Sequence, residues 1–110
     1  MADKSFERGT LYDNGADYFE LNGNSAMKFS AKGAKELCEE ATKRNVFISR
    51  IEGGHWSDSR FRPDSTTTWD SKSDLEAAGK VKENNDLAIE NIDDDASEGF
   101  NAFLITILNL

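Results

Sequence analysis

The sequence predicts a small α/β (α+β) domain in which an antiparallel or mixed sheet is packed by two main helices. Three observations support this fold class. The chain has 110 residues, two segments carry apolar residues at helical spacing, and two others are rich in β-branched and aromatic residues. A chain of this length builds one modest core. With 37% hydrophobic and 31% charged residues, its composition is that of a globular protein rather than a disordered one.

The first 26 residues are expected to form an N-terminal extension. Within it, "TLY" at 10–12 and "DYFEL" at 17–21 flank the turn sequence "DNGA". Short apolar stretches on either side of an Asn-Gly pair are typical of a β-hairpin. We therefore expect residues 1–26 to be an extra hairpin or a non-native segment, and residues 27–110 to form the main domain.

Two helices are expected, near residues 31–44 and 85–98. Ser30 is placed to cap the first helix. The apolar positions of this helix recur at helical spacing, at Ala34, Leu37, Cys38 and Ala41. Asn84 or Asn85 is expected to cap the second helix, because asparagine is favoured at that position.

The sheet is expected to include residues 46–51, parts of 60–69 and 100–108. "VFISRI" at 46–51 is β-branched and aromatic, and Gly53-Gly54 is expected to break this strand. The stretch 100–108 is apolar on both faces through its middle, as in a central strand that is covered on both sides or lies against a partner. Residues 71–82 are polar and are expected to form a linker or a short helix.

The charge balance restricts the class of partner. The chain has 21 acidic and 13 basic residues, a net charge of −8. Such a surface repels nucleic-acid phosphates, so nucleic acid is not expected to bind directly. A basic protein would be attracted by the same field. Seven carboxylates and no basic residue lie between Glu83 and Glu98. These acids either belong to an interaction surface or form a solvated helix end.

Cysteine and membrane signals are sparse. The single cysteine, Cys38, excludes an internal disulfide and a multi-cysteine zinc site, and its helical spacing predicts a small buried side chain. The "DDD" run lacks the spacing of a calcium loop, so no metal and no cofactor are expected. Neither a signal peptide nor a membrane-spanning apolar run is recognised in the sequence, which predicts a cytoplasmic protein without a membrane partner.

The stretch "IEGGHWSDSRFRPDS" at 51–65 supports two different functions. Glu52 and His55 are the residue types of general acid–base catalysis, and together they suggest a small ribonuclease-like hydrolase. That enzyme would need a polyanionic substrate to approach a strongly acidic protein, and the sequence has no second histidine and no basic groove. The hydrolase therefore remains the alternative hypothesis.

The favoured hypothesis is a docking surface. Trp56 and Trp69 are large, rigid side chains of the kind found at interface hot spots, although each is equally suited to the core. Nearby carboxylates would replace phosphates and the aromatic rings would replace bases, with Arg60 and Arg62 orienting the acids. The expected contacts are Trp56, Asp58, Asp64, Trp69 and Asp70, with Glu90, Asp93 and Asp94 as a second electrostatic patch.

Several motifs give the chain a family resemblance. In order along residues 27–110, "LCEEA", "GGHW", "FRPDS", "ENNDLAIENIDDD" and "FLIT" resemble the immunity proteins of the colicin, colicin E5, that cleaves tRNA within the anticodon. "GGHW" together with "NNDLAIEN" is the specific part of this match. Residues 71–82 match poorly, and residues 1–26 precede the position where the family's chain begins.

The resemblance implies a small α/β immunity protein without enzymatic activity of its own. Such a protein binds the nuclease domain of a tRNA-cleaving colicin or related toxin and blocks its tRNA site. By this resemblance, residues 27–110 form the immunity-protein domain. The poor match at 71–82 implies that the cognate toxin is either colicin E5 or a relative, such as a toxin delivered by contact-dependent inhibition.

Overall fold

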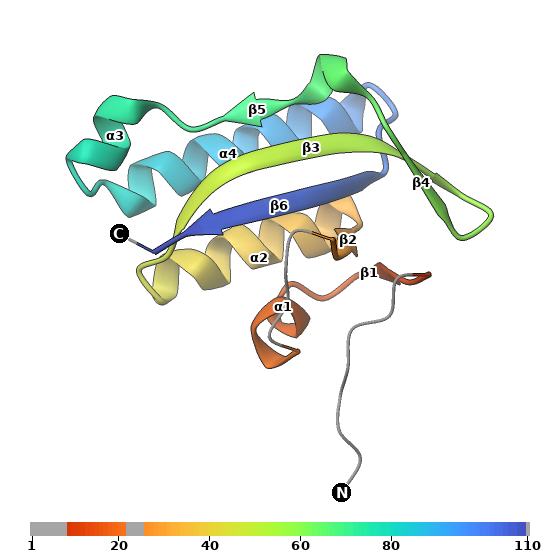
Figure 1. The fold of residues 1–110 in the computed structure, drawn as a ribbon, viewed down its shortest axis with the longest axis horizontal. Coiled ribbons are helices and arrows are strands. Elements are labelled where there is room, and N and C mark those ends of the chain that lie inside the picture. Colours follow the sequence, from red (N-terminus) through yellow and green to blue (C-terminus); the bar gives the residue numbers. More distant parts are fainter. Residues whose placement is uncertain (1–8, 22–25, 110) are drawn as a thin grey trace, which may run out of the picture.

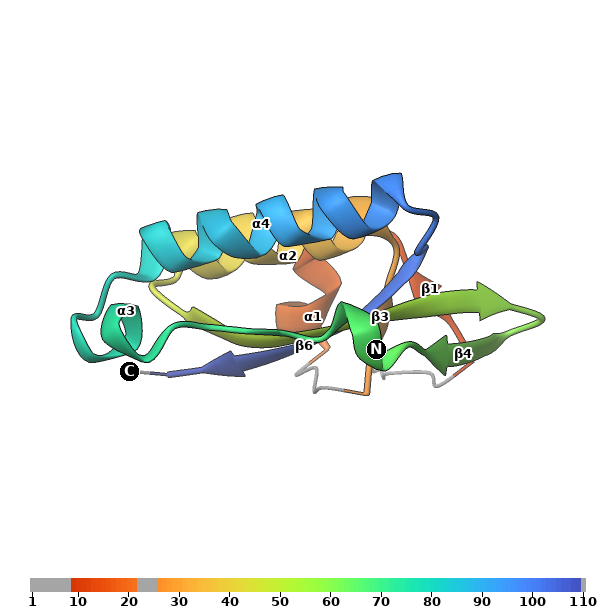
Figure 2. The ribbon, with the colours of Figure 1, turned by 90° about the horizontal axis from the view of Figure 1, so that it is seen from above.

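The computed structural model describes residues 9–21 and 26–109, which form two layers, a sheet and a pair of helices (Figures 1 and 2). The strands are β1 (Leu11–Tyr12), β2 (Lys28–Phe29), β3 (Phe47–Ser57), β4 (Arg60–Pro63), β5 (Trp69–Asp70) and β6 (Ala102–Leu108). The helices are α1 (Ala16–Glu20), α2 (Ala31–Lys43), α3 (Ser73–Ala77) and α4 (Val81–Ser97), with a 3₁₀ turn, η1, at Ser65–Thr67.

The sheet is mixed, one of the two arrangements that the sequence predicted. Its strand order is β1-β2-β6-β3-β4, and β5 pairs with part of β3. β1 is parallel to β2, and all the other pairs are antiparallel. The expectation of a central strand at 100–108 is confirmed, since β6 lies between β2 and β3. Both α2 and α4 cover the same face of the sheet, and none of the described helices lies across the opposite face (Figure 2).

The predicted first helix is confirmed as α2. Ser30 caps it by accepting a hydrogen bond from the backbone N–H of Gly33 at 3.1 Å. The four residues at helical spacing, Ala34, Leu37, Cys38 and Ala41, are all fully buried. Burial raises the pKa of the Cys38 thiol to about 12, so this cysteine is held as an unreactive thiol.

The expected break at Gly53-Gly54 is wrong, because β3 continues through both glycines to Ser57. Neighbouring groups come too close to either position for a side chain. A Cβ atom at Gly53 would lie 2.7 Å from Oγ1 of Thr67, and one at Gly54 would lie 2.2 Å from the backbone oxygen of Arg62. The glycines therefore permit close approach within the sheet instead of ending the strand.

The second helix, α4, begins earlier than expected, at Val81. Asn84 and Asn85 are fully buried within it and do not cap it, so that prediction is wrong. The Asn85 side chain accepts from the Ile48 N–H at 3.0 Å and donates to the Val46 carbonyl at 2.8 Å. Asn84 donates to the Ile48 carbonyl at 2.7 Å. The two side-chain amides thus provide hydrogen-bond partners for backbone groups of Val46 and Ile48. β5 does not provide them, because it pairs only with Arg50 and Ile51.

The predicted N-terminal hairpin is also wrong, because residues 16–20 form helix α1. Tyr12 and Tyr18 are buried beside Phe29 of β2, with ring centroids 5.8 and 6.3 Å from that of Phe29. A helix allows this packing, since it turns Tyr18 toward the core formed by β2 and α2. The division of the chain at Met27 stays a prediction, but the described residues before it are packed on the fold.

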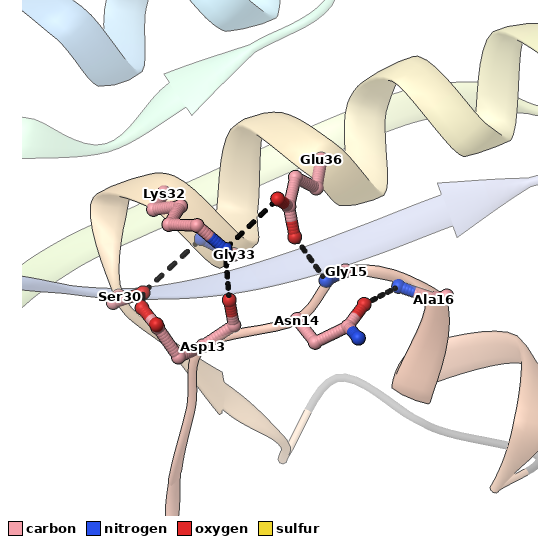
Figure 3. A network of polar contacts seen from close by, with 8 residues as sticks. All are labelled: Asp13, Asn14, Gly15, Ala16, Ser30, Lys32, Gly33 and Glu36. Atoms are coloured by element: carbon pink, nitrogen blue, oxygen red, sulfur yellow. Dashed lines mark hydrogen bonds and ion pairs between the residues drawn. The ribbon is translucent and has the colours of Figure 1, made fainter.

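Polar contacts join this N-terminal segment to α2 (Figure 3). Glu36 accepts from the Gly15 N–H at 3.1 Å and forms an ion pair with Lys32 at 2.9 Å. Lys32 also donates to the Asp13 carbonyl at 3.1 Å, and Ser30 donates to the Asp13 carboxylate. The hydrogen bonds of Lys32 and of the Gly15 N–H lower the pKa of Glu36. The N-terminal segment is therefore held on the fold by polar contacts of residues 13–15 as well as by the packing of Tyr12 and Tyr18.

The polar stretch at 71–82 contains the short helix α3 and the start of α4, in agreement with one of the two expectations. Leu75 of α3 is buried with Phe47 and Val81 in a second, smaller apolar cluster. Within the described ranges, no helix is both long and apolar enough to cross a membrane.

Candidate functional site

The outer half of β3 forms a hairpin with β4 that extends from the sheet (Figure 1). Trp56 pairs with Phe61, and Ser57 pairs with Arg60. The two connecting residues, Asp58 and Ser59, have positive φ angles of 51° and 59°. A two-residue turn with both φ values positive matches the right-handed twist of the paired strands. Asp58 is consequently exposed at the tip.

Trp56 lies on the sheet face that α2 and α4 leave uncovered, which we call the open face. Side chains alternate along a strand, and Ile51 packs into the core on the helix side. The side chains of Glu52 and Trp56 therefore point to the open face. Trp56 is half-buried, as is its partner Phe61. Because residues paired across strands share a face, the two aromatic side chains together form an apolar patch at the base of the hairpin.

Further residues share the open face with Trp56. Glu52 pairs with Leu104, which in turn pairs with Lys28. In the next row, Arg50 forms an ion pair with Asp70 at 3.4 Å. The open face is thus apolar in part and carries charges of both signs. Sequence reasoning missed Leu104 and Arg50, although the alternation within each strand was a signal that could have found them.

Trp69 points the other way. It pairs with Ile51 and packs, half-buried, against the main core. Trp69 and Asp70, which are adjacent in sequence, therefore serve different faces, the first facing the helices and the second the open face. A partner contact through the exposed part of Trp69 stays a prediction.

Asp64 is engaged in local structure. Its carboxylate caps η1 by accepting from the backbone N–H of Thr66 at 2.9 Å and from the Thr66 hydroxyl at 2.6 Å. These bonds, followed by the proximity of His55, lower the pKa of Asp64. The carboxylate is therefore charged and held beside the hairpin, and a partner contact through Asp64 stays a prediction.

The second predicted patch lies in the helical layer. Glu90, Asp93 and Asp94 are exposed on α4, across the molecule from the open face (Figure 2). Asp93 forms an ion pair with Lys35 of α2 at 2.8 Å. The structure therefore does not bring the two predicted patches together, and one flat partner surface cannot contact both.

The third aspartate of the run, Asp95, is 8% exposed, and its Oδ2 atom has no hydrogen-bond partner. Burial raises its pKa, and the nearby carboxylates of Glu98 and Asp94 raise it further. This acid is a structural feature of the C-terminal end of α4 rather than part of an exposed patch.

The pair proposed for hydrolysis is not assembled. Glu52 and His55 are three residues apart on one extended strand, so their side chains leave on opposite faces. The His55 ring is 4.9 Å from that of Phe100, with which it is tilted by 33°. Arg60 and Arg62 form no ion pair with a carboxylate in the part of the chain that the structure describes; they line a surface pocket with Ser57 and Asp58. Residues 9–21 and 26–109 hold no group of three or more potential metal ligands.

Comparison with known proteins agrees with the resemblance in the sequence. The family described as "Colicin-E5 Imm protein" matches residues 27–108. The Colicin-E5 immunity protein of Escherichia coli is 48% identical over 81 residues, covering 74% of this chain and 98% of the relative. A second relative from the same species, the Colicin-E5 immunity protein in ColE9, has the same identity and coverage.

A third relative, the immunity protein CdiI of Burkholderia pseudomallei, is 33% identical over 95 residues, which is 86% of each chain. This match covers more of the chain than the residues from Met27 onward, so it extends into the N-terminal segment that packs on β2 and α2. From the family match over residues 27–108 and the identity to these relatives, the chain belongs to the colicin-E5 immunity protein family.

Proposed function

We propose that the protein binds the nuclease domain of a tRNA-cleaving colicin or related toxin in the cytoplasm and blocks its RNA site. The observation that carries this proposal is the open face. It joins the half-buried pair Trp56 and Phe61 to the exposed turn at Asp58 and to the carboxylates of Glu52 and Asp70. Membership of an immunity-protein family supports a toxin as the partner.

The chemistry of this surface suits a site built for RNA. A nuclease that holds tRNA presents basic groups to phosphates and apolar or aromatic surfaces to bases. On the immunity protein, carboxylates would meet the basic groups and Trp56 would occupy a base-binding position. The net charge of −8 would increase the rate of encounter with a basic domain. The aromatic pair would slow dissociation, because buried aromatic anchors carry most of the binding energy of an interface.

The same geometry favours an inhibitor over an enzyme. Glu52 and His55 do not share a face, so they cannot act as an acid–base pair on one substrate atom. Glu52 instead lies beside Leu104 on the open face, where it is suited to contact a basic side chain.

The first test is cleavage of total tRNA by the colicin E5 nuclease domain, with and without one equivalent of this protein. We expect one equivalent to abolish cleavage. If cleavage continues, the test is repeated with a panel of related tRNA-cleaving domains, including toxins of contact-dependent inhibition systems. If the protein binds and inhibits none of the domains in the panel, the proposal is wrong.

The second test separates the open face from general charge. Asp58→Asn removes one exposed charge at the hairpin tip, whereas Asp74→Asn removes one exposed charge on α3. We expect Asp58→Asn to lower the association rate and its dependence on salt, and Asp74→Asn to change both less. Equal association rates for the two variants at low salt would exclude mimicry centred on this hairpin.

A further inference from the structure

Trp56 lies just beyond the point where the central strand pair ends. β6 begins at Ala102, which pairs with Gly54 of β3. Two residues further along β3, no residue of β6 is left to pair with Trp56. On its other side β3 pairs with β4, through Phe61 opposite Trp56. Without a further contact, the strand that carries this tryptophan would belong to a two-stranded ribbon only.

The side chain of Asn101 supplies the missing contact. Its Oδ1 atom accepts from the Trp56 N–H at 2.7 Å, and its Nδ2 atom donates to the Trp56 carbonyl at 3.2 Å. The Asn101 backbone N–H donates to the Gly54 carbonyl at 3.1 Å. One side-chain amide therefore donates and accepts as a strand residue opposite Trp56 would.

We infer that Asn101 is a positioning residue for the partner-binding face, holding Trp56 and the β3–β4 hairpin in line with the central sheet. The inference rests on the proposed function, because the surface it positions is the proposed toxin contact. Asn101 itself is exposed and lies outside both apolar clusters. Its contribution is thus local and separate from the stability of the core.

The backbone of Asn101 gives no other reason for an asparagine. Asparagine often occupies positions with positive φ. Among the described non-glycine residues, positive φ occurs at Asn45, Asp58 and Ser59 and not at Asn101. The side-chain bonds to Trp56 are what distinguish asparagine from other residues here.

Holding Trp56 in place matters because a mobile anchor must be ordered when the complex forms. Two-stranded ribbons twist strongly and are marginally stable alone. Ordering such a ribbon at the interface costs binding free energy, which a preorganised strand avoids. Loss of the Asn101 amide is therefore expected to weaken binding through Trp56 without removing any toxin contact.

The test uses the full-length protein with Asn101→Ala, and Asn109→Ala as the control, since Asn109 is an exposed asparagine at the other end of β6. The first readout needs no toxin: it is amide hydrogen exchange at Trp56. Because its hydrogen-bond acceptor is removed, we expect exchange at Trp56 to accelerate about tenfold in Asn101→Ala. The Ile51 amide should stay unchanged, and the control should match the wild type at both positions.

The second readout is the rate of dissociation from an inhibited toxin domain. Asn101→Ala should raise this rate about tenfold, which corresponds to the net value of one to two hydrogen bonds. In a Trp56→Ala background the same substitution should raise the dissociation rate by a smaller factor, because the aromatic anchor that Asn101 holds in place is then absent. A purely structural role would instead give additive effects.

Unchanged exchange at Trp56, or fully additive dissociation rates, would overturn the inference. Faster exchange with an unchanged dissociation rate would overturn it as well, because Asn101 would then order Trp56 without any effect on toxin binding. Failure of the proposed function is distinguished from these outcomes by the wild type alone, which would bind and inhibit none of the toxin domains.

Discussion

Trp56 and Trp69 point to opposite faces of the same sheet. Trp69 is paired with Ile51, whose side chain packs under the helices, while Trp56 is five residues further along β3 and leaves on the open face. Both are half-buried, so exposure alone does not separate them. Their neighbours do, because Trp69 contacts the core and Trp56 shares its surface with Phe61 and the hairpin turn.

The two tryptophans should therefore respond differently to truncation. We expect Trp69→Ala to lower the free energy of unfolding by about 3 kcal/mol, since it leaves a cavity beside the core. Trp56→Ala should cost under about 1 kcal/mol of stability, as expected for a surface position, but raise the rate of toxin dissociation by about 30-fold. Urea unfolding and surface plasmon resonance measure the two effects. If instead Trp69→Ala speeds dissociation and Trp56→Ala lowers stability, the toxin contact is not on the open face.

A methyl group at Gly15 tests whether the N-terminal segment is fastened to α2. A Cβ atom at this position would lie 2.1 Å from the Leu37 backbone nitrogen, so Gly15→Ala must push α1 away from the helix. We expect a loss of about 2 kcal/mol in the free energy of unfolding, in the range of overpacking substitutions. Gly9→Ala is the control, because a Cβ atom at Gly9 would meet nothing within 4 Å. Equal urea midpoints for the two variants would contradict the packing of this segment.

Asn85 is expected to be critical for stability even though it is polar. Its amide bonds the Ile48 N–H, the Val46 carbonyl and the Thr42 hydroxyl. Asn85→Ala would leave the first two groups buried without partners, so we expect a loss of about 3 kcal/mol in unfolding experiments. The neighbouring Asp86→Ala removes an exposed ion pair with Lys82 and should cost no more than about 0.5 kcal/mol. Similar losses for both variants would show that the buried amide contributes little.

Asp95 should make stability fall as the pH rises. Burial raises its pKa in the folded protein, so the folded state binds more protons than the unfolded state between the ordinary aspartate pKa and the raised one. Stability is lost across this window on going up in pH, and it stays lower above it. Asp95→Asn should therefore be more stable than the wild type at pH 7, with a difference that shrinks as the pH falls through the window.

Thermal unfolding of the two proteins at matched pH values measures this difference. The comparison cancels groups such as Glu36, whose lowered pKa acts in the opposite direction. Asp74→Asn, at an exposed position on α3, is the control. A difference that did not change with pH would mean that the Asp95 carboxylate has its ordinary pKa in the folded protein.

The parts of the fold that were predicted correctly are those with local signals. The Ser30 cap and the apolar spacing that predict α2 both lie within the residues of that helix. The run of apolar residues in β6 likewise predicts a central strand. The errors arose where a distant contact decides. Gly53 and Gly54 stay in a strand because other chain segments approach them. Residues 16–20 form a helix whose Tyr18 packs against Phe29, which is distant in sequence.

The candidate site was predicted in part for the same reason. Alternation along β3 places Trp56 and Glu52 together, and this can be read from the sequence. The sequence could not show that Glu90 and Asp94 lie in a different layer, because that depends on which sheet face α4 covers. The roles of Asn84, Asn85 and Asn101 were missed because an asparagine that binds a distant backbone looks in sequence like one that caps a helix or lies in a loop.

The buried Asn84 and Asn85 amides also fix the alignment of β3 against α4. Their bonds to Val46 and Ile48 fit one position of β3 along the helix, and a slip of one residue would break them while turning every side chain of the strand to the other face. The same amides occupy backbone groups that a strand from another molecule would need for pairing. The open face, the proposed toxin-binding surface, is thus kept in register by two side chains that a partner bound to that face would not contact.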